Sequence, residues 1–283
     1  MTPISGGGRV PIEAVNNRFG GRVAVVTGSS ANPSIGRSCA LRLGREGASV
    51  VINGRDENQL ATTEHELRDL GFDVVAVAGS MEDDATPDRL IAAAIDHFGR
   101  VDLLVNTIGG IRSPSTLEHM DKAALMGTLE LNTWPTVALI QAALRRGLAD
   151  DGGGSVVNIS SGSPHKTTPS MIAYAAAKAA LNTLTRTMAA DLGPRGVRVN
   201  AVSPGLTKTT ATKGMWKDDD GHSAGANVVL GHLTQADDIA AAAAFLLSDD
   251  ARQITGVLLD VDGGNHLGGG GWTPITSKPE TSS

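Results

Sequence analysis

The sequence predicts an α/β protein: a single doubly wound domain with a parallel sheet of seven strands and helices on both faces. Short runs rich in Val, Ile and Leu recur along the 283 residues, and several do not alternate with polar residues. Strands that are buried on both faces show this pattern. Longer segments with helical spacing separate the runs, and alternating β and α elements favour a parallel sheet. Aromatic residues make up only 3% of the chain, so small aliphatic side chains must fill the core.

The expected elements follow one another without a second domain boundary. Strands are predicted at residues 22–28, 48–54, 73–79, 101–107, 154–161, 197–205 and 256–264. Helices are predicted at residues 35–47, 57–71, 86–99, 129–147, 174–193 and 236–250. Several helical segments reach a glycine that suits a helix C-terminus. We expect a flexible arm at residues 1–20, one folded domain at 21–265, and a flexible Gly-rich tail at 266–283.

Composition excludes several classes of function. The net charge is −6 and no basic cluster is interleaved with aromatic residues, so we expect no nucleic-acid partner. A single cysteine, Cys39, excludes an internal disulfide and fits a reducing compartment. Neither a signal-peptide pattern nor a run of 18 apolar residues occurs, so we expect a cytoplasmic protein without a membrane partner. The single cysteine and scattered histidines have no zinc-ligand spacing, so we expect no metal site.

A glycine-bearing turn joins the first expected strand to the first expected helix, in RVAVVTGSSANPSIGRSCALRLG. Strand, turn and helix in this order predict a dinucleotide site, because a helix N-terminus offers free N–H groups and positive potential to a pyrophosphate. Gly28 permits a sharp exit from the strand, and Gly36 permits close packing of the helix on it. The alternative interpretation is an ordinary turn that Ser34 caps.

The only tyrosine, Tyr174, lies on an expected helix with Lys178 four residues later. Residues at i and i+4 share one helix face. The unperturbed pKa of tyrosine is about 10, and a nearby ammonium favours the phenolate. The pair can therefore exchange a proton with a carbonyl or alcohol oxygen while hydride moves to or from a cofactor. On the motif alone, a packed tyrosine beside a surface lysine remains open.

Five motifs in the right order resemble the short-chain dehydrogenase/reductase family over residues 20 to 265. The family's turn reads T-G-x-x-x-G-I-G, whereas TGSSANPSIG is two residues longer and has Ser34 at the middle glycine. The longer turn is similar to that of enoyl reductases in the same superfamily. The resemblance implies a Rossmann-type dinucleotide-binding domain. In this turn it implies cofactor contacts from Gly28, Ser30, Ser34, Ile35 and Gly36.

The same resemblance assigns the catalytic residues. In GSVVNISSGSP, Ser161 precedes Tyr174 by thirteen residues and matches the family's catalytic serine. Asn132 in LELNTWP matches the asparagine that completes the tetrad by kinking a helix and holding a water near the lysine. Pro135 makes a local helix irregularity plausible on independent grounds. The implied catalytic set is Asn132, Ser161, Tyr174 and Lys178.

Further matches imply the remaining cofactor contacts. VNTIGG stands where the family has N-N-A-G, which retains Asn106 and Gly109 and changes the two residues between them. VNAVSPGLTKT matches P-G-x-x-x-T. The resemblance therefore adds to the cofactor set the residues Asn106, Gly109, Tyr174, Lys178, Pro204, Gly205 and Thr209. Ser80 stands where an aspartate often binds adenine.

The end of the second strand indicates which nicotinamide cofactor binds. VVINGRD has no acidic residue at the position that would bind both ribose hydroxyls, and Arg55 follows Gly54 there. A guanidinium is a fixed fork that suits a 2′-phosphate. The resemblance thus implies NADP(H), with NAD less favoured. Arg55 as a solvated charge, followed directly by Asp56, is the alternative.

These observations predict an NADP(H)-dependent oxidoreductase that interconverts a carbonyl and a secondary alcohol, with Tyr174 as general acid/base and a small molecule as substrate. An enoyl reductase is one alternative, although those enzymes usually place six residues between tyrosine and lysine and this chain has three. A non-catalytic dinucleotide-binding regulator is another. The segment 210–234 is expected to set the substrate. The apolar helices 129–147 and 174–193 pair across a two-fold axis in the family, which implies a homotetramer.

Overall fold

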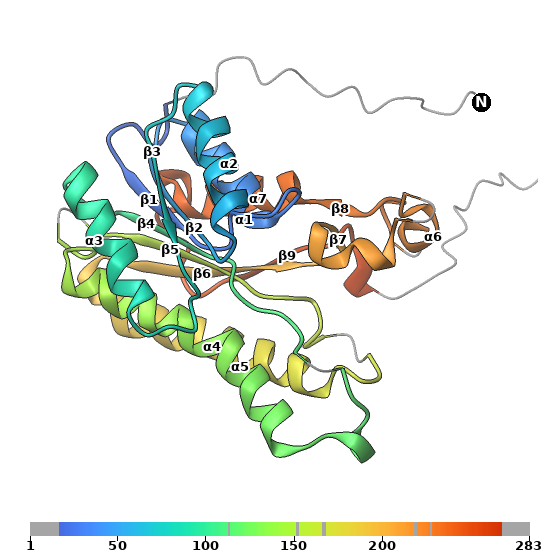
Figure 1. The fold of residues 1–283 in the computed structure, drawn as a ribbon. Helices are drawn as coiled ribbons and strands as arrows, with labels where there is room; N and C mark the ends of the chain where they lie inside the picture. The colour runs from blue at the N-terminus through green and yellow to red at the C-terminus, as the bar shows by residue number, and fades with distance from the viewer. Residues whose placement is uncertain are drawn as a thin grey trace, which may run out of the picture.

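Seven parallel strands form one sheet in the order β3-β2-β1-β4-β5-β6-β9 (Figure 1). The computed structural model describes residues 17–112, 114–150, 153–165, 168–217, 220–226 and 228–267. The strands are β1 (Val23–Val26), β2 (Ser49–Gly54), β3 (Val74–Ala78), β4 (Leu103–Asn106), β5 (Ser155–Ile159), β6 (Arg198–Pro204) and β9 (Leu258–Val261). Strand order reverses between β1 and β4, and such a sheet binds ligands at the carboxyl ends beside this point. The predicted fold class is confirmed.

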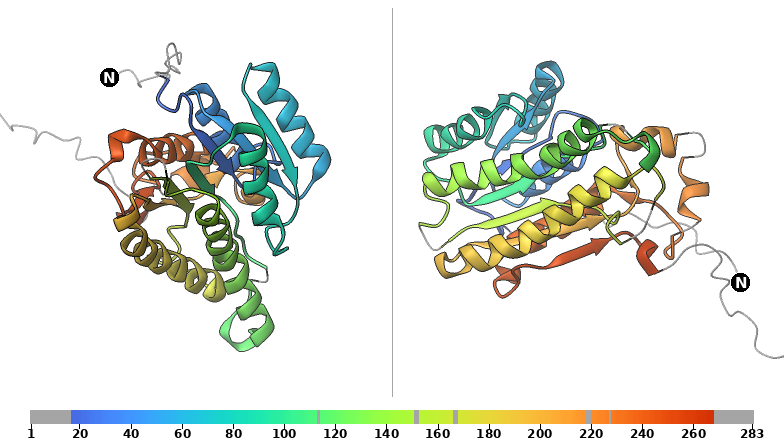
Figure 2. Two further views of the ribbon diagram at one scale, coloured as in Figure 1. Left: turned by 90° about the vertical axis from the view of Figure 1, so that its left-hand side faces the viewer. Right: turned by 90° about the horizontal axis from the view of Figure 1, so that it is seen from below.

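Six long helices cover the two faces of the sheet. They are α1 (Ile35–Arg45), α2 (Glu57–Asp69), α3 (Thr86–Phe98), α4 (Lys122–Arg145), α5 (Ile172–Leu192) and α7 (Ala236–Leu247). Buried residues of α1, α2 and α7 share one apolar cluster, and those of α3, α4 and α5 share the other. Figure 2 shows α4 and α5 side by side against the sheet. The sheet is therefore covered on both sides, which explains its continuous apolar runs.

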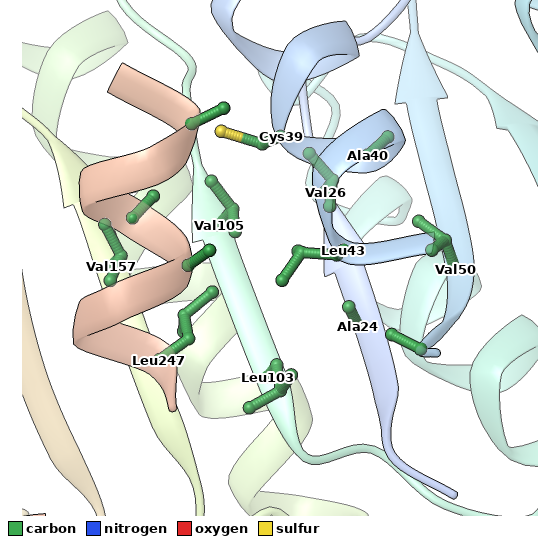
Figure 3. Packing of buried hydrophobic residues seen from close by; sticks show 14 of the residues in the cluster. Ala24, Val26, Cys39, Ala40, Leu43, Val50, Leu103, Val105, Val157 and Leu247 are labelled. Carbon is green, nitrogen blue, oxygen red and sulfur yellow. The ribbon is translucent and has the colours of Figure 1, made fainter. Parts of the chain in front are cut away.

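The alternation of side chains along each strand distributes the core between these layers. In β1, Ala24 and Val26 join the layer of α1 and α7, while Val23 and Val25 join the opposite one. Figure 3 shows Cys39 of α1 in the first layer, among small and branched apolar side chains. Burial raises the pKa of the Cys39 thiol to about 12, so this cysteine is protonated and packs as a small apolar residue.

The chain N-terminal to β1 packs on the domain further back than the sequence predicted. Phe19, placed in the expected arm at 1–20, is fully buried. Arg18 pairs with the buried Glu46 at 2.6 Å, and Arg42 pairs with the same carboxylate. At the other end, Asn265–Leu267 form a 3₁₀ turn, η5. The rest of the expected arm and tail, 1–16 and 268–283, lies outside the described residues.

Helix α4 differs from its prediction in two ways. It begins at Lys122, seven residues before the expected start, where Asp121 caps it by accepting the N–H of Ala124 at 2.7 Å. The segment before residue 129 lacks a clear apolar stripe, which hid these two turns from the sequence pattern. The helix also continues through Pro135, so the irregularity expected there does not interrupt it.

The connection between β6 and α7, residues 205–235, contains structure that the sequence did not predict. It holds β7 (Thr207–Lys208), the 3₁₀ segment η3 (Thr210–Met215), α6 (His222–Gly225) and β8 (Thr234–Gln235). β7 and β8 pair in parallel and form a separate two-stranded sheet. Figure 1 shows these elements, in orange, together beyond the main sheet. Because β6 ends at Pro204, the β6–α7 connection lies at the carboxyl end of the sheet.

Candidate active site

The turn between β1 and α1 has the backbone that its glycines predicted. Gly28 has φ +66°, a conformation that favours glycine. A Cβ at Gly36 would lie 2.4 Å from the carbonyl oxygen of Gly28, so helix and turn meet too closely for any side chain. Ser34 caps α1 by accepting the N–H of Arg37 at 3.2 Å, and Ile35 begins the helix. The turn thus presents a helix N-terminus at the switch point of the sheet.

The turn between β1 and α1 also contacts the β6–α7 connection. The carbonyl oxygen of Pro33 accepts the N–H of Thr210 at 2.9 Å and its hydroxyl at 3.1 Å. Ser30 lies against the end of β2, where a Cβ at Gly54 would be 2.5 Å from the Cβ of Ser30. The turn therefore links the end of β2 to the segment that follows β6.

At the end of β2, the acid that follows Arg55 is already engaged. Asp56 caps α2 by accepting the N–H of Gln59 at 3.0 Å, and it also accepts the side-chain amide of Gln59 at 2.8 Å. Arg55 is exposed, and it makes no hydrogen bond or ion pair with any residue in the described ranges. Ser80, at the end of β3, accepts the N–H of Glu82 at 3.2 Å and so supports its own turn.

Asn106, a predicted cofactor contact, points into the sheet. Its side-chain amide donates to Asn158 Oδ1 on β5 at 2.9 Å, and the Asn158 amide donates to Thr185 on α5 at 2.9 Å. All three residues are buried. This chain of hydrogen bonds fixes β4 to β5 and α5, so the side chain of Asn106 supports the floor of the site. Thr107, a departure from the family's pattern, takes no part in this chain; its N–H and its hydroxyl both donate to Thr27, the residue after β1.

The side chains of Asn132 and Lys178 lie against the two glycines that follow β4. A Cβ at Gly109 would lie 2.5 Å from Asn132 Oδ1 and 2.8 Å from Lys178 Nζ, so only glycine fits there. Asn132 accepts the N–H of Gly110 at 3.0 Å and donates to the carbonyl oxygen of the same residue at 2.9 Å. Its amide also donates to Thr128 at 2.8 Å, within α4. The buried asparagine therefore holds the loop after β4 against α4.

Lys178 is buried in the floor of the site, with 3% of its surface exposed. Its ammonium donates to the carbonyl oxygen of Ile159 at 3.0 Å, at the end of β5. Burial lowers the pKa of Lys178 to about 8. An ammonium has three donors, and this one bond leaves others free to bind a hydroxyl.

Ser161 and Tyr174 lie beside this lysine. Lys178 Nζ is 5.8 Å from the centroid of the Tyr174 ring. Burial raises the pKa of Tyr174, and hydrogen bonding by Ser161 opposes the rise. The sequence led us to expect an ammonium that brings this pKa down. In the structure the pKa is raised, because the effect of burial outweighs that of the hydrogen bond with Ser161.

The P-G-x-x-x-T motif follows β6. The carbonyl oxygen of Pro204 accepts the N–H of Gly162 at 3.1 Å, which ties this motif to the residue after Ser161. A Cβ at Gly205 would lie 2.8 Å from Asp262 Cβ, so glycine permits close contact with the chain after β9. Thr209 is buried at the start of η3, and its hydroxyl pairs with that of Thr212 at 3.1 Å. Every predicted site residue thus lies at the carboxyl ends of the strands or in the elements beside them.

Two residues near the site escaped the sequence analysis. Ser163 bonds Ser161 through both its N–H and its hydroxyl, and the only available signal was a second serine two residues on. Lys208 pairs with Asp220 at 2.8 Å and lies 5.8 Å from the ring of Trp216, which organises the β6–α7 connection. Both contacts depend on a loop geometry that periodicity does not reveal.

Neither a membrane-spanning helix nor a metal-binding cluster occurs in the described part of the chain. None of its helices is both long enough and apolar enough to cross a membrane. Across the same residues, no group of three His, Cys, Asp or Glu side chains is placed to hold a metal ion.

The chain matches known proteins over most of its length. A family model described as Enoyl-(Acyl carrier protein) reductase matches residues 28–266. The 3beta-hydroxysteroid dehydrogenase 1 of Eggerthella lenta is 34% identical over 250 residues, covering 87% of this chain and 94% of the relative. A short-chain type dehydrogenase/reductase from Mycobacterium ulcerans has a similar structure, with a TM-score of 0.82, 31% identity, and coverage of 88% and 91%. A 7 alpha-hydroxysteroid dehydrogenase, solved with NADH and 7-oxo glycochenodeoxycholic acid, has a TM-score of 0.82 and is 32% identical. The match covers 89% of this chain and 97% of that one.

Proposed function

The chain belongs to the short-chain dehydrogenase/reductase family of oxidoreductases, and we propose that it uses NADP(H) to interconvert a carbonyl group and a secondary alcohol. One observation carries the proposal: Ser161, Tyr174 and the buried ammonium of Lys178 come together where β5 ends and α5 begins. A phenol and an ammonium that share a partly dry site can exchange a proton with one substrate oxygen.

In this proposal Tyr174 is the general acid/base, with the proton transferred at its Oη. Ser161 donates a hydrogen bond to the reacting oxygen and holds it against the phenol. Lys178 keeps one donor on Ile159 and offers another to a cofactor hydroxyl. Asn132 acts as a positioning residue, because its contacts go to the backbone of Gly110. A bound nicotinamide would supply the hydride and, when oxidised, a cationic ring that favours the phenolate.

The residues present fit such a cofactor. The helix N-terminus behind Gly28 and Gly36 suits the pyrophosphate, and the space that a Cβ would fill at Gly109 borders Lys178. Two buried polar atoms at the strand ends, Asn53 Oδ1 and Ser203 Oγ, have no partner in the described part of the chain. We propose that the turn residues Gly28, Ser30, Ser34, Ile35 and Gly36 hold the pyrophosphate side. We assign the remaining contacts to the backbone of Asn106, whose side chain is engaged by Asn158, and to Gly109, Tyr174, Lys178, Pro204, Gly205 and Thr209.

Arg55 supports the choice of NADP(H) over NAD(H). Its guanidinium is free to bind a 2′-phosphate, and Asp56, which would repel that phosphate, is engaged as the cap of α2. We expect Arg55→Ala to weaken NADPH binding by roughly 1.5–3 kcal/mol, the range for a hydrogen bond to a charged group. NADH binding should change little. Titration calorimetry with both cofactors measures this, and Arg45→Ala, on α1, is the control. A loss equal for both cofactors contradicts the assignment.

The test of the activity is turnover with a panel of ketones and secondary alcohols, each with NADP(H) and NAD(H). Hydroxysteroids belong in the panel because two relatives are named for them. We expect cofactor absorbance to change with at least one carbonyl–alcohol pair, and faster with NADP(H). No turnover with any pair, while the cofactor binds, would favour the non-catalytic dinucleotide-binding regulator instead.

A second candidate function is an enoyl reductase. The longer turn between β1 and α1 and the description of the matching family model favour it. The three-residue spacer between Tyr174 and Lys178 favours the carbonyl–alcohol reaction. Reduction of a 2-enoyl thioester, compared with that of the matching 3-oxo thioester, separates the two. We expect only the 3-oxo compound to be reduced.

We extend the proposal to a cytoplasmic homotetramer. Met126 and Trp134 on α4 are 52% and 45% exposed, and Ile172 on α5 is exposed as well. These apolar side chains stand on the two helices that pair between subunits in the family. Such a pairing would remove them from water and stabilise the assembly. Light scattering should give about four times the 29.0 kDa of one chain. A mass near 29.0 kDa would contradict the assembly, and twice that mass would leave one interface.

A further inference from the structure

Ser163 lies in a turn that is attached to the end of β6 and closed by a hydrogen bond of its own. The N–H of Gly162 donates to Pro204 at 3.1 Å, and the N–H of His165 donates back to Gly162 at 3.0 Å. The first bond attaches the turn to the end of β6, and the second closes it. These backbone hydrogen bonds define the position of Ser163 relative to Ser161.

Two hydrogen bonds join Ser163 to Ser161. The N–H of Ser163 donates to Ser161 Oγ at 3.1 Å. The two hydroxyl oxygens are 2.9 Å apart, so one hydroxyl donates to the other. Among the described residues, Ser161 Oγ is the only hydrogen-bond partner of the Ser163 hydroxyl.

The hydrogen-bond capacity of a hydroxyl decides the direction of this second bond during the reaction. A serine hydroxyl has one donor and two acceptor lone pairs. The N–H of Ser163 occupies one lone pair of Ser161. When negative charge develops on the reacting oxygen or on Tyr174, that oxygen is the strongest acceptor nearby, and the proton of Ser161 goes to it. The remaining lone pair of Ser161 then accepts the hydroxyl of Ser163.

We propose that Ser163 is a positioning residue for Ser161: its hydroxyl donates to Ser161 Oγ and so directs the Ser161 proton to the reacting oxygen and the Tyr174 phenolate. Hydrogen bonds in such a chain polarise one another, so the donor at its end is strengthened. The expected effect of Ser163 on the reaction rate rests on the proposed carbonyl–alcohol reaction. Its expected effect on the titration of Tyr174 requires only Ser161 and Tyr174.

The first test needs no substrate. Tyr174 is the only tyrosine, so the ultraviolet absorbance of phenolate against pH titrates this residue alone. Ser163→Ala removes the hydroxyl and keeps the N–H. We expect it to raise the pKa of Tyr174 by up to about one, the value equivalent to one neutral hydrogen bond. Ser163→Thr, which keeps a hydroxyl, should restore the wild-type titration. An unchanged titration in Ser163→Ala would overturn the proposal.

Ser160→Ala serves as the matched control. Ser160 adjoins Ser161, but its buried hydroxyl bonds Asn182 on α5 and takes no part in the chain of hydroxyls. Its loss should lower stability without moving the Tyr174 titration. If Ser160→Ala moves the titration as far as Ser163→Ala does, the effect is structural and the proposal is wrong.

Kinetics provide the second test, once a substrate is known. We expect Ser163→Ala to lower kcat by about 2- to 12-fold, the fold change that corresponds to a neutral hydrogen bond, with KM nearly unchanged. In the Ser161→Ala background the same change should have no further effect. A loss confined to KM, or one that adds fully to that of Ser161→Ala, would mean that Ser163 contacts substrate directly and would overturn the proposal. Failure to find any carbonyl substrate would count against the proposed function while the titration still tests Ser163.

Discussion

The floor of the candidate site and the β6–α7 connection beside it are built differently. The floor is buried: Asn132, Lys178 and the Asn106–Asn158–Thr185 chain bond strands and helices whose positions the sheet fixes. The connection combines the pairing of β7 with β8 with contacts between more exposed groups, such as Lys208 with Asp220 and Trp216. Met215 and Leu230 stand on it with most of their surface exposed. From this difference we propose that the floor sets the chemistry and that the connection sets the choice of substrate.

Removing the charge from the floor should have the largest effect. Lys178→Met deletes the buried ammonium and its bond to Ile159 while keeping an apolar side chain of similar length. We expect turnover to fall by about 10²- to 10⁴-fold, the range for a lost acid–base partner. The pH at which phenolate absorbance appears should rise in the cofactor-bound protein, since a cation near Tyr174 has been removed. Steady-state kinetics and ultraviolet titration measure the two effects. Turnover within a few fold of wild type would contradict the role of Lys178.

The buried ammonium should also appear in stability against pH. The pKa of Lys178 is about 8 in the folded chain, against an ordinary lysine value of 10.5. Between these values the unfolded chain binds the additional proton at this group, so the contribution of Lys178 to the free energy of unfolding rises with pH across this window. The cost of burying the charge is fully present below pH 8, and its relief amounts to at most about 3 kcal/mol.

Urea unfolding without cofactor measures this slope, with Lys178→Met as the comparison. The raised pKa values of Cys39 and Tyr174 act in the opposite direction above the ordinary values of 9.0 for cysteine and 10.0 for tyrosine. Both groups remain in Lys178→Met, so the difference between wild type and this variant reports Lys178. If wild type and Lys178→Met show the same dependence on pH, the ammonium is not buried as described.

The smallest effect is expected in the β6–α7 connection. Lys208→Met removes the ion pair with Asp220 and the cation over the Trp216 ring. We expect KM for the carbonyl substrate to rise roughly 2- to 5-fold with kcat nearly unchanged, since exposed pairs contribute about 0.5–1 kcal/mol. Lys213→Met, on η3 of the same connection, is the control. A loss of kcat as large as that of Lys178→Met would erase the distinction between the two regions.

The same contrast explains what the sequence could predict. The seven strands follow from apolar runs, and the spacing of Tyr174 and Lys178 places both on one helix face whatever the loops do. The start of α4 at Lys122 was missed, because its first turns depend on the Asp121 cap rather than on an apolar stripe. The burial of Phe19 was missed because one aromatic residue makes no periodic pattern.

Within the site, the backbone positions were predictable and the electrostatics were not. Gly36 and Gly109 stand where a Cβ would meet neighbouring atoms, and the motifs identified both. The pKa of Tyr174 went the other way from the prediction, since burial cannot be read from a four-residue spacing. The bond of Ser163 to Ser161 and the link between Pro33 and Thr210 both depend on loop geometry.

Transfer of deuteride from a cofactor labelled at the nicotinamide C4 position tests the central claim most directly. Wild type and Tyr174→Phe would be saturated with labelled NADPH and mixed with the best ketone in single turnovers. Mass spectrometry then locates the deuterium in the product. We predict that wild type places the deuterium on the carbonyl carbon. Tyr174→Phe keeps the ring and loses the phenolic proton, and we expect its transfer rate to be lower than that of wild type by a factor of about 10² or more. Cofactor binding should be nearly intact in the variant. Transfer by Tyr174→Phe at close to the wild-type rate would contradict the account.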